Sequence, residues 1–163
     1  MTINREKYTN AILYLLQKLG GEVHGKKKLA KLLYFADFSF FQKYEQSITG
    51  DEYAAMSMGP FPRKMPDILA LLSEEGKLKC EQRQEWVGLE PTEVYTVLAA
   101  SNTSILTDEE MATLDRVAKN YGGLTGKQLE NLSHAEAPWI GTLQGETIAY
   151  ELAFYREPES ETA

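Results

Sequence analysis

The chain has 163 residues, a formal net charge of −7, two histidines and one cysteine, Cys80. This length suits a single domain that buries its own core, and one cysteine excludes an intrachain disulfide. No apolar run approaches the roughly 18–20 residues needed to cross a bilayer, and the N-terminal sequence lacks a secretory signal. We therefore expect a soluble, reduced, cytoplasmic protein. Its negative charge disfavours general nucleic-acid binding and suits a basic partner.

Two helices are predicted in the first part of the chain. Apolar residues at helical spacing predict one from Asn4 to Leu19, ended by Gly20-Gly21. The second begins near Gly25 and runs to about Lys43, with lysines at 26–28 opposing the helix dipole. Such a helix is either the centre of a bundle or meets a partner with its aromatic face, because it carries apolar side chains on opposite sides. One stripe contains Leu29, Leu32, Leu33, Ala36 and Phe40, and the other contains Tyr34, Phe38 and Phe41.

The middle of the chain changes from irregular to helical to β. Residues 53–58 are predicted to be extended or irregular, because turn-forming sequences flank them. A third helix is expected to begin near Pro66 and to end at Gly76. Residues 78–87 and 92–98 are rich in β-forming side chains, and Gly88 to Pro91 connects them, which predicts an antiparallel hairpin.

Helical signals return after residue 106. Thr107 and Glu110 form a capping box before a periodic helix, and Thr125 opens a shorter one. The last ordered segment is predicted at 147–155, before an acidic tail at 157–163 that we expect to be mobile. The sequence thus predicts a mainly α fold: one compact helical domain, residues 1–156, built around a central hydrophobic helix with a small antiparallel β-hairpin.

Residues that could carry catalysis are few. A metal site would need His24, His134 and Cys80 to converge, and no CxxC or HExxH spacing is present. The glycine pairs lie where helices end and do not form a phosphate-binding loop. We predict no catalytic residue, no cofactor and no metal. A site assembled in space from Ser57 and His134 stays open at this stage.

Three carboxylates near the second helix are a further candidate. Asp37, Asp51 and Glu52 could form an acid–base pair or bind a divalent ion. Structural roles are favoured, because Asp51 follows a Thr-Gly turn and Asp37 lies within reach of a lysine or a loop amide. For His134 and Trp139, packing is likewise favoured over a binding pocket.

Basic residues concentrate at the start of the second helix. The sequence is compatible with a solvated helix start, a local anion or nucleic-acid contact, or an electrostatic guide for a partner. No aromatic residue separates the first lysines, which disfavours single-stranded nucleic-acid binding. The cluster contains Lys26, Lys27, Lys28 and Lys31, with Arg63 and Lys64 as further members.

The order of several short motifs resembles the Panacea domain of SocA-like antitoxins and phage-associated GepA-like proteins. K-L-L-Y-F-A-D at 31–37 is followed by T-G-D-x-Y-x-A at 49–55 and G-P at 59–60. Weaker matches follow in order at 124–129, 133–134, 138–139 and 148–151. Their number and order carry the resemblance, because each piece mostly specifies packing and turns. The motif residues are Lys31, Leu32, Leu33, Asp37, Gly50, Asp51, Gly59, Pro60, His134 and Trp139.

The resemblance implies a non-enzymatic antitoxin of a bacterial or prophage toxin–antitoxin module that binds its toxin directly. The alternative that it implies is an adaptor that delivers the toxin to a protease. The alternatives from a different class are a nucleic-acid-binding regulator and an uncharacterised hydrolase. The expected partner is a cognate toxin encoded by an adjacent gene. We expect no membrane contact, and nucleic-acid binding is disfavoured. We expect the toxin to dock in an apolar groove formed by Tyr34, Phe38, Phe41, Tyr53, Met56, Met58 and Phe61.

Overall fold

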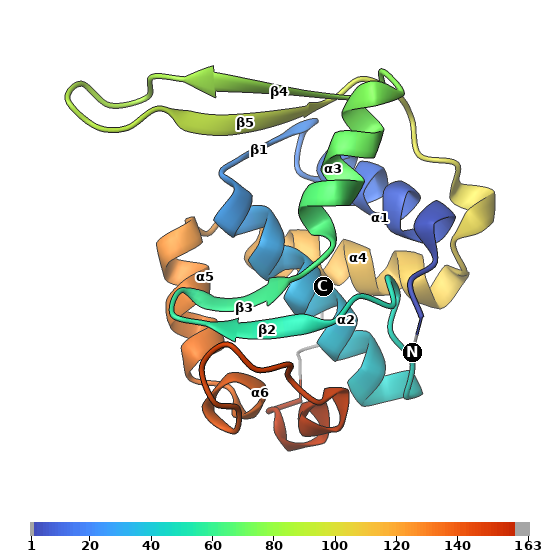
Figure 1. The fold of residues 1–163 in the computed structure, drawn as a ribbon. Helices are drawn as coiled ribbons and strands as arrows, with labels where there is room; N and C mark the ends of the chain where they lie inside the picture. The colour runs from blue at the N-terminus through green and yellow to red at the C-terminus, as the bar shows by residue number, and fades with distance from the viewer. Residues whose placement is uncertain (1, 159–163) are drawn as a thin grey trace.

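The computed structural model describes residues 2–158 and confirms the mainly α fold (Figure 1). Most of the acidic tail predicted at 157–163 lies outside the described residues. The predicted helices and strands begin and end within a few residues of the predicted positions, and the final segment is a 3₁₀ helix. The structure adds β1, β3, η1 and α6, which were not predicted. They are α1 (Arg5–Lys18), β1 (Glu22–His24), α2 (Lys26–Tyr44), β2 (Tyr53–Met56), β3 (Gly59–Pro62), α3 (Met65–Glu74), β4 (Leu78–Arg83), β5 (Thr92–Val97), η1 (Thr103–Ile105), α4 (Asp108–Tyr121), α5 (Gly126–His134), α6 (Ala137–Ile140) and η2 (Tyr150–Tyr155).

Helix α2 lies at the centre of the molecule. Helices α4, α5 and η2 and strand β3 all pack against it, so it is covered on every side (Figure 1). Leu29 and Leu32 are fully buried on one side, and Tyr34 and Phe38 are fully buried on the other. The central hydrophobic helix predicted from the two apolar stripes is therefore present.

Two small antiparallel sheets flank this helix. The predicted hairpin consists of β4 and β5, in a register that pairs Leu78 with Val97 and Arg83 with Thr92. Strand β1 was not predicted. It adds to the free edge of β5, with Val23 opposite Tyr95, and completes a sheet of order β1-β5-β4. The segment predicted to be extended or irregular forms β2, which pairs with β3.

The outer end of the β4–β5 hairpin extends away from the body of the molecule (Figure 1). We call residues 84–91, which connect these two strands, the arm tip. Sheet pairing and contacts with α3 hold the inner end of the hairpin.

Hydrogen bonds at the helix starts follow the predicted caps. The Thr107 amide donates to Glu110 Oε1 at 2.8 Å, and the Glu110 amide donates to Thr107 Oγ1 at 3.1 Å. Helix α2 differs, because its first residue follows Gly25, which has φ 102° and provides no side-chain cap. The amide groups at the start of α2 therefore lack a capping acceptor from this residue.

Candidate functional site

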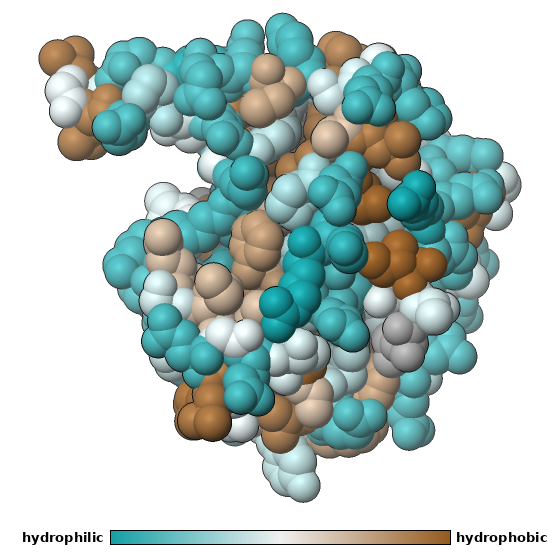
Figure 2. Space-filling view, in the orientation of Figure 1, coloured by the Kyte–Doolittle hydropathy of each residue, from teal (hydrophilic) through white to brown (hydrophobic). Residues whose placement is uncertain are grey.

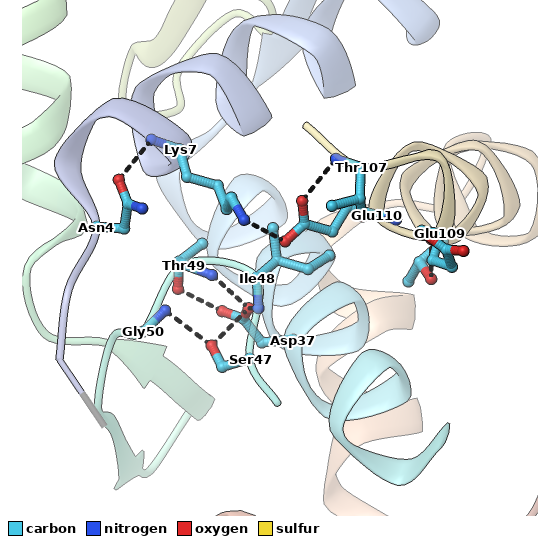
Figure 3. Close-up of polar contacts among 11 residues, drawn as sticks. Asn4, Lys7, Asp37, Ser47, Ile48, Thr49, Gly50, Thr107, Glu109 and Glu110 are labelled. Carbon is cyan, nitrogen blue, oxygen red and sulfur yellow. Dashed lines mark hydrogen bonds and ion pairs between the residues drawn. The ribbon is translucent and has the colours of Figure 1, made fainter. Parts of the chain in front are cut away.

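Asp37 fastens the turn after α2 to the helix. Its Oδ1 accepts hydrogen bonds from the Ile48 and Thr49 amides at 2.8 and 2.9 Å and from Ser47 Oγ at 2.9 Å (Figure 3). Its Oδ2 accepts from Thr49 Oγ1 and Tyr53 OH, each at 2.6 Å. Burial raises the pKa of Asp37, although these donors oppose the shift. A carboxylate so fully engaged holds a loop in place and has no free oxygen for acid–base chemistry.

Asp51 ties the same loop to α1 and α3. Its Oδ2 accepts from Tyr8 OH at 2.7 Å and from the Lys64 amide at 2.9 Å. Gly50, just before it, has φ 75°, and a Cβ there would lie 2.0 Å from Thr2 O. The T-G-D motif therefore requires glycine for its backbone and aspartate for its acceptors. These contacts agree with the structural roles favoured from sequence for both aspartates.

The aromatic stripe of α2 is not on the surface. Tyr34, Phe38 and Tyr53 have no exposed area, and Phe41 is 5% exposed. The Phe38 ring stacks on Tyr150 of η2, with centroids 4.6 Å apart. The expectation that this stripe lines an open groove is therefore wrong, because the C-terminal segment covers it.

Arg156 holds that C-terminal segment in place. The Arg156 Nε lies 2.8 Å from Glu136 Oε1, which also accepts from Tyr34 OH at 2.7 Å. Arg156 is 4% exposed, so this ion pair is largely shielded from solvent. No sequence signal pointed to this ion pair, since Glu136 lies 20 positions from Arg156.

The remaining predicted contact residues do lie at a hollow on the surface. Met56 and Met58 are 46% and 57% exposed at the β2–β3 turn, and Phe61 is partly buried beside them. They form one wall of a largely apolar groove of about 370 Å³, and the start of α2 forms the other. We call this the α2 groove. It is lined by Lys26, Lys27, Lys31, Met56, Ser57, Met58, Gly59 and Phe61.

The lysine cluster predicted from sequence forms part of this groove, and most of its ammonium groups have partners within the chain. Lys27 Nζ lies 2.9 Å from Glu130 Oε1, and Lys28 Nζ donates to the Gly122 carbonyl at 2.7 Å. Lys26, with a side chain 42% exposed, lies 4.0 Å from the nearest carboxylate oxygen of Glu93. This arrangement differs from an open basic helix fitted to a nucleic-acid groove, because the cations are divided among separate contacts.

Lys31 lies beneath the groove. It is 2% exposed, and its Nζ donates to the Pro60 carbonyl at 3.0 Å. Burial, assisted by the nearby Lys27 charge, lowers the pKa of Lys31 to about 8. Gly59 has φ 107°, and a Cβ there would approach Lys31 Cε to 2.6 Å and Ser133 Oγ to 2.7 Å. The G-P motif thus lets the β2–β3 turn lie directly on the lysine.

His134 and Trp139 support the same turn from behind. Their rings stack with centroids 4.0 Å apart, and Trp139 Nε1 donates to the Met56 carbonyl at 2.9 Å. His134 Nε2 is buried without a hydrogen-bond partner in the described part of the chain. The pair therefore packs against the turn, as favoured from sequence. Among the described residues, no hydrogen bond joins Ser57 to His134 or Trp139.

No metal-binding cluster occurs within residues 2–158: no group of three or more His, Cys, Asp or Glu side chains is placed to hold an ion. Over the same residues, no helix is long and apolar enough to cross a membrane. Cys80 is exposed on β4.

Residues 29–140 match the family described as the antitoxin SocA-like, Panacea domain. Neither the curated proteins nor the solved structures contain a match to this chain. The matched range begins within α2 and ends with α6, so it includes the Asp37 and Asp51 anchors, the β2–β3 turn and the His134–Trp139 stack. Because this match covers well over half of the 163 residues, the chain belongs to the SocA-like antitoxin, Panacea domain family.

Proposed function

We propose that this protein is the antitoxin of a bacterial or prophage toxin–antitoxin module and neutralises its toxin by direct binding. Membership of the SocA-like antitoxin family is the observation that carries this proposal. The role is non-enzymatic, and the partner is a toxin encoded by an adjacent gene.

The α2 groove is the toxin-binding surface in this proposal. Exposed Met56 and Met58 provide flexible, polarisable side chains that adapt to an apolar partner. The turn that carries them is held by Trp139 and by the Lys31–Pro60 contact, so little ordering is needed when a partner binds. Lys26 at the rim adds a cation that favours a carboxylate on the bound segment.

Co-expression tests the function. The product of the neighbouring gene is expressed alone and together with this protein, and growth on plates is compared with recovery of a complex by co-purification. We expect restored growth and a stable complex. Continued toxicity at matched expression, with no complex recovered, would overturn the antitoxin assignment.

A pair of variants tests the surface. Met58→Asp places a charge on the exposed wall of the groove, whereas Tyr155→Asp places one on an exposed aromatic residue of η2. We expect Met58→Asp to weaken toxin binding by at least about 2 kcal/mol and Tyr155→Asp to leave it unchanged. A complex unaffected by Met58→Asp would place the toxin elsewhere on the molecule without affecting the antitoxin assignment.

Toxin lifetime separates blocking from delivery to a protease. In the proposed mechanism the bound toxin persists, so a pulse-chase experiment should show equal toxin half-lives with and without this protein. A shortened half-life that depends on this protein would instead identify an adaptor.

A further inference from the structure

The arm tip carries apolar side chains that nothing in the described chain covers. Trp86, Val87 and Leu89 are 68%, 102% and 63% exposed, and Figure 2 shows apolar residues at the end of the projecting arm. Residues of this kind at the end of a projecting hairpin usually mark an interaction site, because water contact with clustered apolar side chains is unfavourable. The arm tip contains Glu85 and Glu90 and no lysine or arginine.

The α2 groove has the opposite character. Its apolar wall is accompanied by Lys26, Lys27 and Lys31, and no aspartate or glutamate lines it. Lys27 is balanced by Glu130 behind the groove, and Lys26 lies 4.0 Å from a Glu93 oxygen. Lys31 donates to the uncharged Pro60 carbonyl, so the groove keeps an excess of positive charge. The groove therefore accepts an apolar segment that carries negative charge, and the arm tip is such a segment.

Both surfaces adjoin the start of α2. His24 Nδ1 contacts Glu85 at the beginning of the arm tip, and the Gly25 amide donates to the Glu93 carbonyl at 2.8 Å. Figure 2 shows a hollow beneath the arm, on the side where Figure 1 places the β2–β3 turn. In a dimer with two-fold symmetry, each copy offers the same arm and the same groove. One two-fold contact can therefore bury the arm of each copy against the groove of the other.

We infer that a second copy of this chain occupies the α2 groove, with the arm tip of each protomer inserted in the groove of the other. Val87 and its apolar neighbours contact Met56, Met58 and Phe61 of the partner copy. Glu90 pairs with Lys26 across the interface. Self-association needs no toxin, but it fills the groove that the proposed function assigns to the toxin. A second copy and a bound toxin therefore exclude each other at that groove.

Oligomeric state tests this inference. Mass is measured by sedimentation velocity and by light scattering after size exclusion, over a wide range of protein concentration. We expect a concentration-dependent dimer. Val87→Asp should raise the dimer dissociation constant at least about tenfold. Tyr155→Asp, which places a charge on another exposed residue that does not line the groove, should not change it. A monomer at every concentration, or a dimer indifferent to Val87→Asp, would overturn the inference.

Charge exchange tests the pairing. Lys26→Glu and Glu90→Lys each place like charges together and should weaken the dimer. The double variant carrying both changes reverses the pair and should restore the dissociation constant to within a few-fold of the original. Thermal melts establish that each variant is folded, and both sites are at least partly exposed. Failure of the double variant to restore association would exclude the Glu90–Lys26 contact and with it this placement of the arm.

Discussion

Replacing Asp37 by alanine removes the acceptor that holds the turn at residues 47–50 against α2. The Ile48 and Thr49 amides, 2.8 and 2.9 Å from the carboxylate, would be left buried without it. Each buried donor that loses its partner costs about 1–3 kcal/mol. The hydroxyls of Thr49 and Tyr53 also lose an acceptor, but a hydroxyl can rotate toward another one.

Part of this cost is offset. Burial raises the pKa of Asp37, so the ionised carboxylate is itself unfavourable in the folded protein, and its removal returns some free energy. We expect Asp37→Ala to lower the free energy of unfolding by about 2–5 kcal/mol. Asp37→Asn keeps one oxygen for the two amides and should cost less, about 1–2 kcal/mol.

Urea denaturation followed by circular dichroism measures these values. Asp67→Ala is the matched control, because Asp67 is an exposed carboxylate of α3 and its loss should change stability by no more than about 0.5 kcal/mol. If Asp37→Ala costs less than about 1 kcal/mol, the turn does not depend on this carboxylate and the reasoning fails.

The pH dependence gives an independent check. Because the pKa of Asp37 is raised above its usual 3.8 in the folded protein, folded chains hold this proton more tightly than unfolded chains do. The free energy of unfolding of the wild type relative to Asp37→Asn should therefore fall as pH rises through 3.8 and the raised folded pKa. A rise over the same range would contradict the role of burial.

Three further predictions concern α2 and the groove. Leu32→Ala should cost about 2–5 kcal/mol and Phe38→Ala about 3–5 kcal/mol by calorimetry, since both side chains are fully buried; an undiminished melting temperature for Phe38→Ala would contradict the covered aromatic stripe. Gly59→Ala should cost about 1–3 kcal/mol more than Gly145→Ala in urea denaturation. Both glycines have positive φ, but of the two only Gly59 would bring its Cβ against another side chain, that of Lys31 or Ser133. Equal losses would show that the turn can move off the lysine. The pKa of Lys31 is about 8 in the folded protein against a usual 10.5, so the unfolded chain holds this proton more tightly. The free energy of unfolding of the wild type relative to Lys31→Met should therefore rise between pH 8 and pH 10.5. A difference in free energy that does not change with pH would show that Lys31 is solvated.

Local sequence signals predicted much of the fold. Helical periodicity and the Thr107–Glu110 capping box gave α4, and the same kind of evidence gave α1, α2 and α5. These signals succeed because they depend on residues a few positions apart. Strand β1 was missed for the converse reason: its three residues become a strand only by pairing with β5, about seventy positions later in the chain.

The candidate site was predicted only in part. The Met56 to Phe61 turn was assigned to the surface groove, and the structure places it there. The Tyr34, Phe38 and Phe41 stripe was assigned to the same groove, but its cover, Tyr150 and its neighbours, comes from the far end of the chain. An apolar stripe shows that something covers it, and the sequence pattern alone does not distinguish a partner from a distant part of the same chain.

The aromatic face of α2 is covered late in synthesis, because its cover comes from the C-terminal segment. On the ribosome, α2 emerges more than a hundred residues before Tyr150 and Arg156, which stack on or brace its aromatic face. Until η2 is synthesised, the sides of Phe38 and Phe41 that face Tyr150 remain uncovered on every nascent chain. Chains cut short before Tyr150 should therefore present an adhesive aromatic surface that complete chains conceal, and premature termination would yield fragments prone to aggregate.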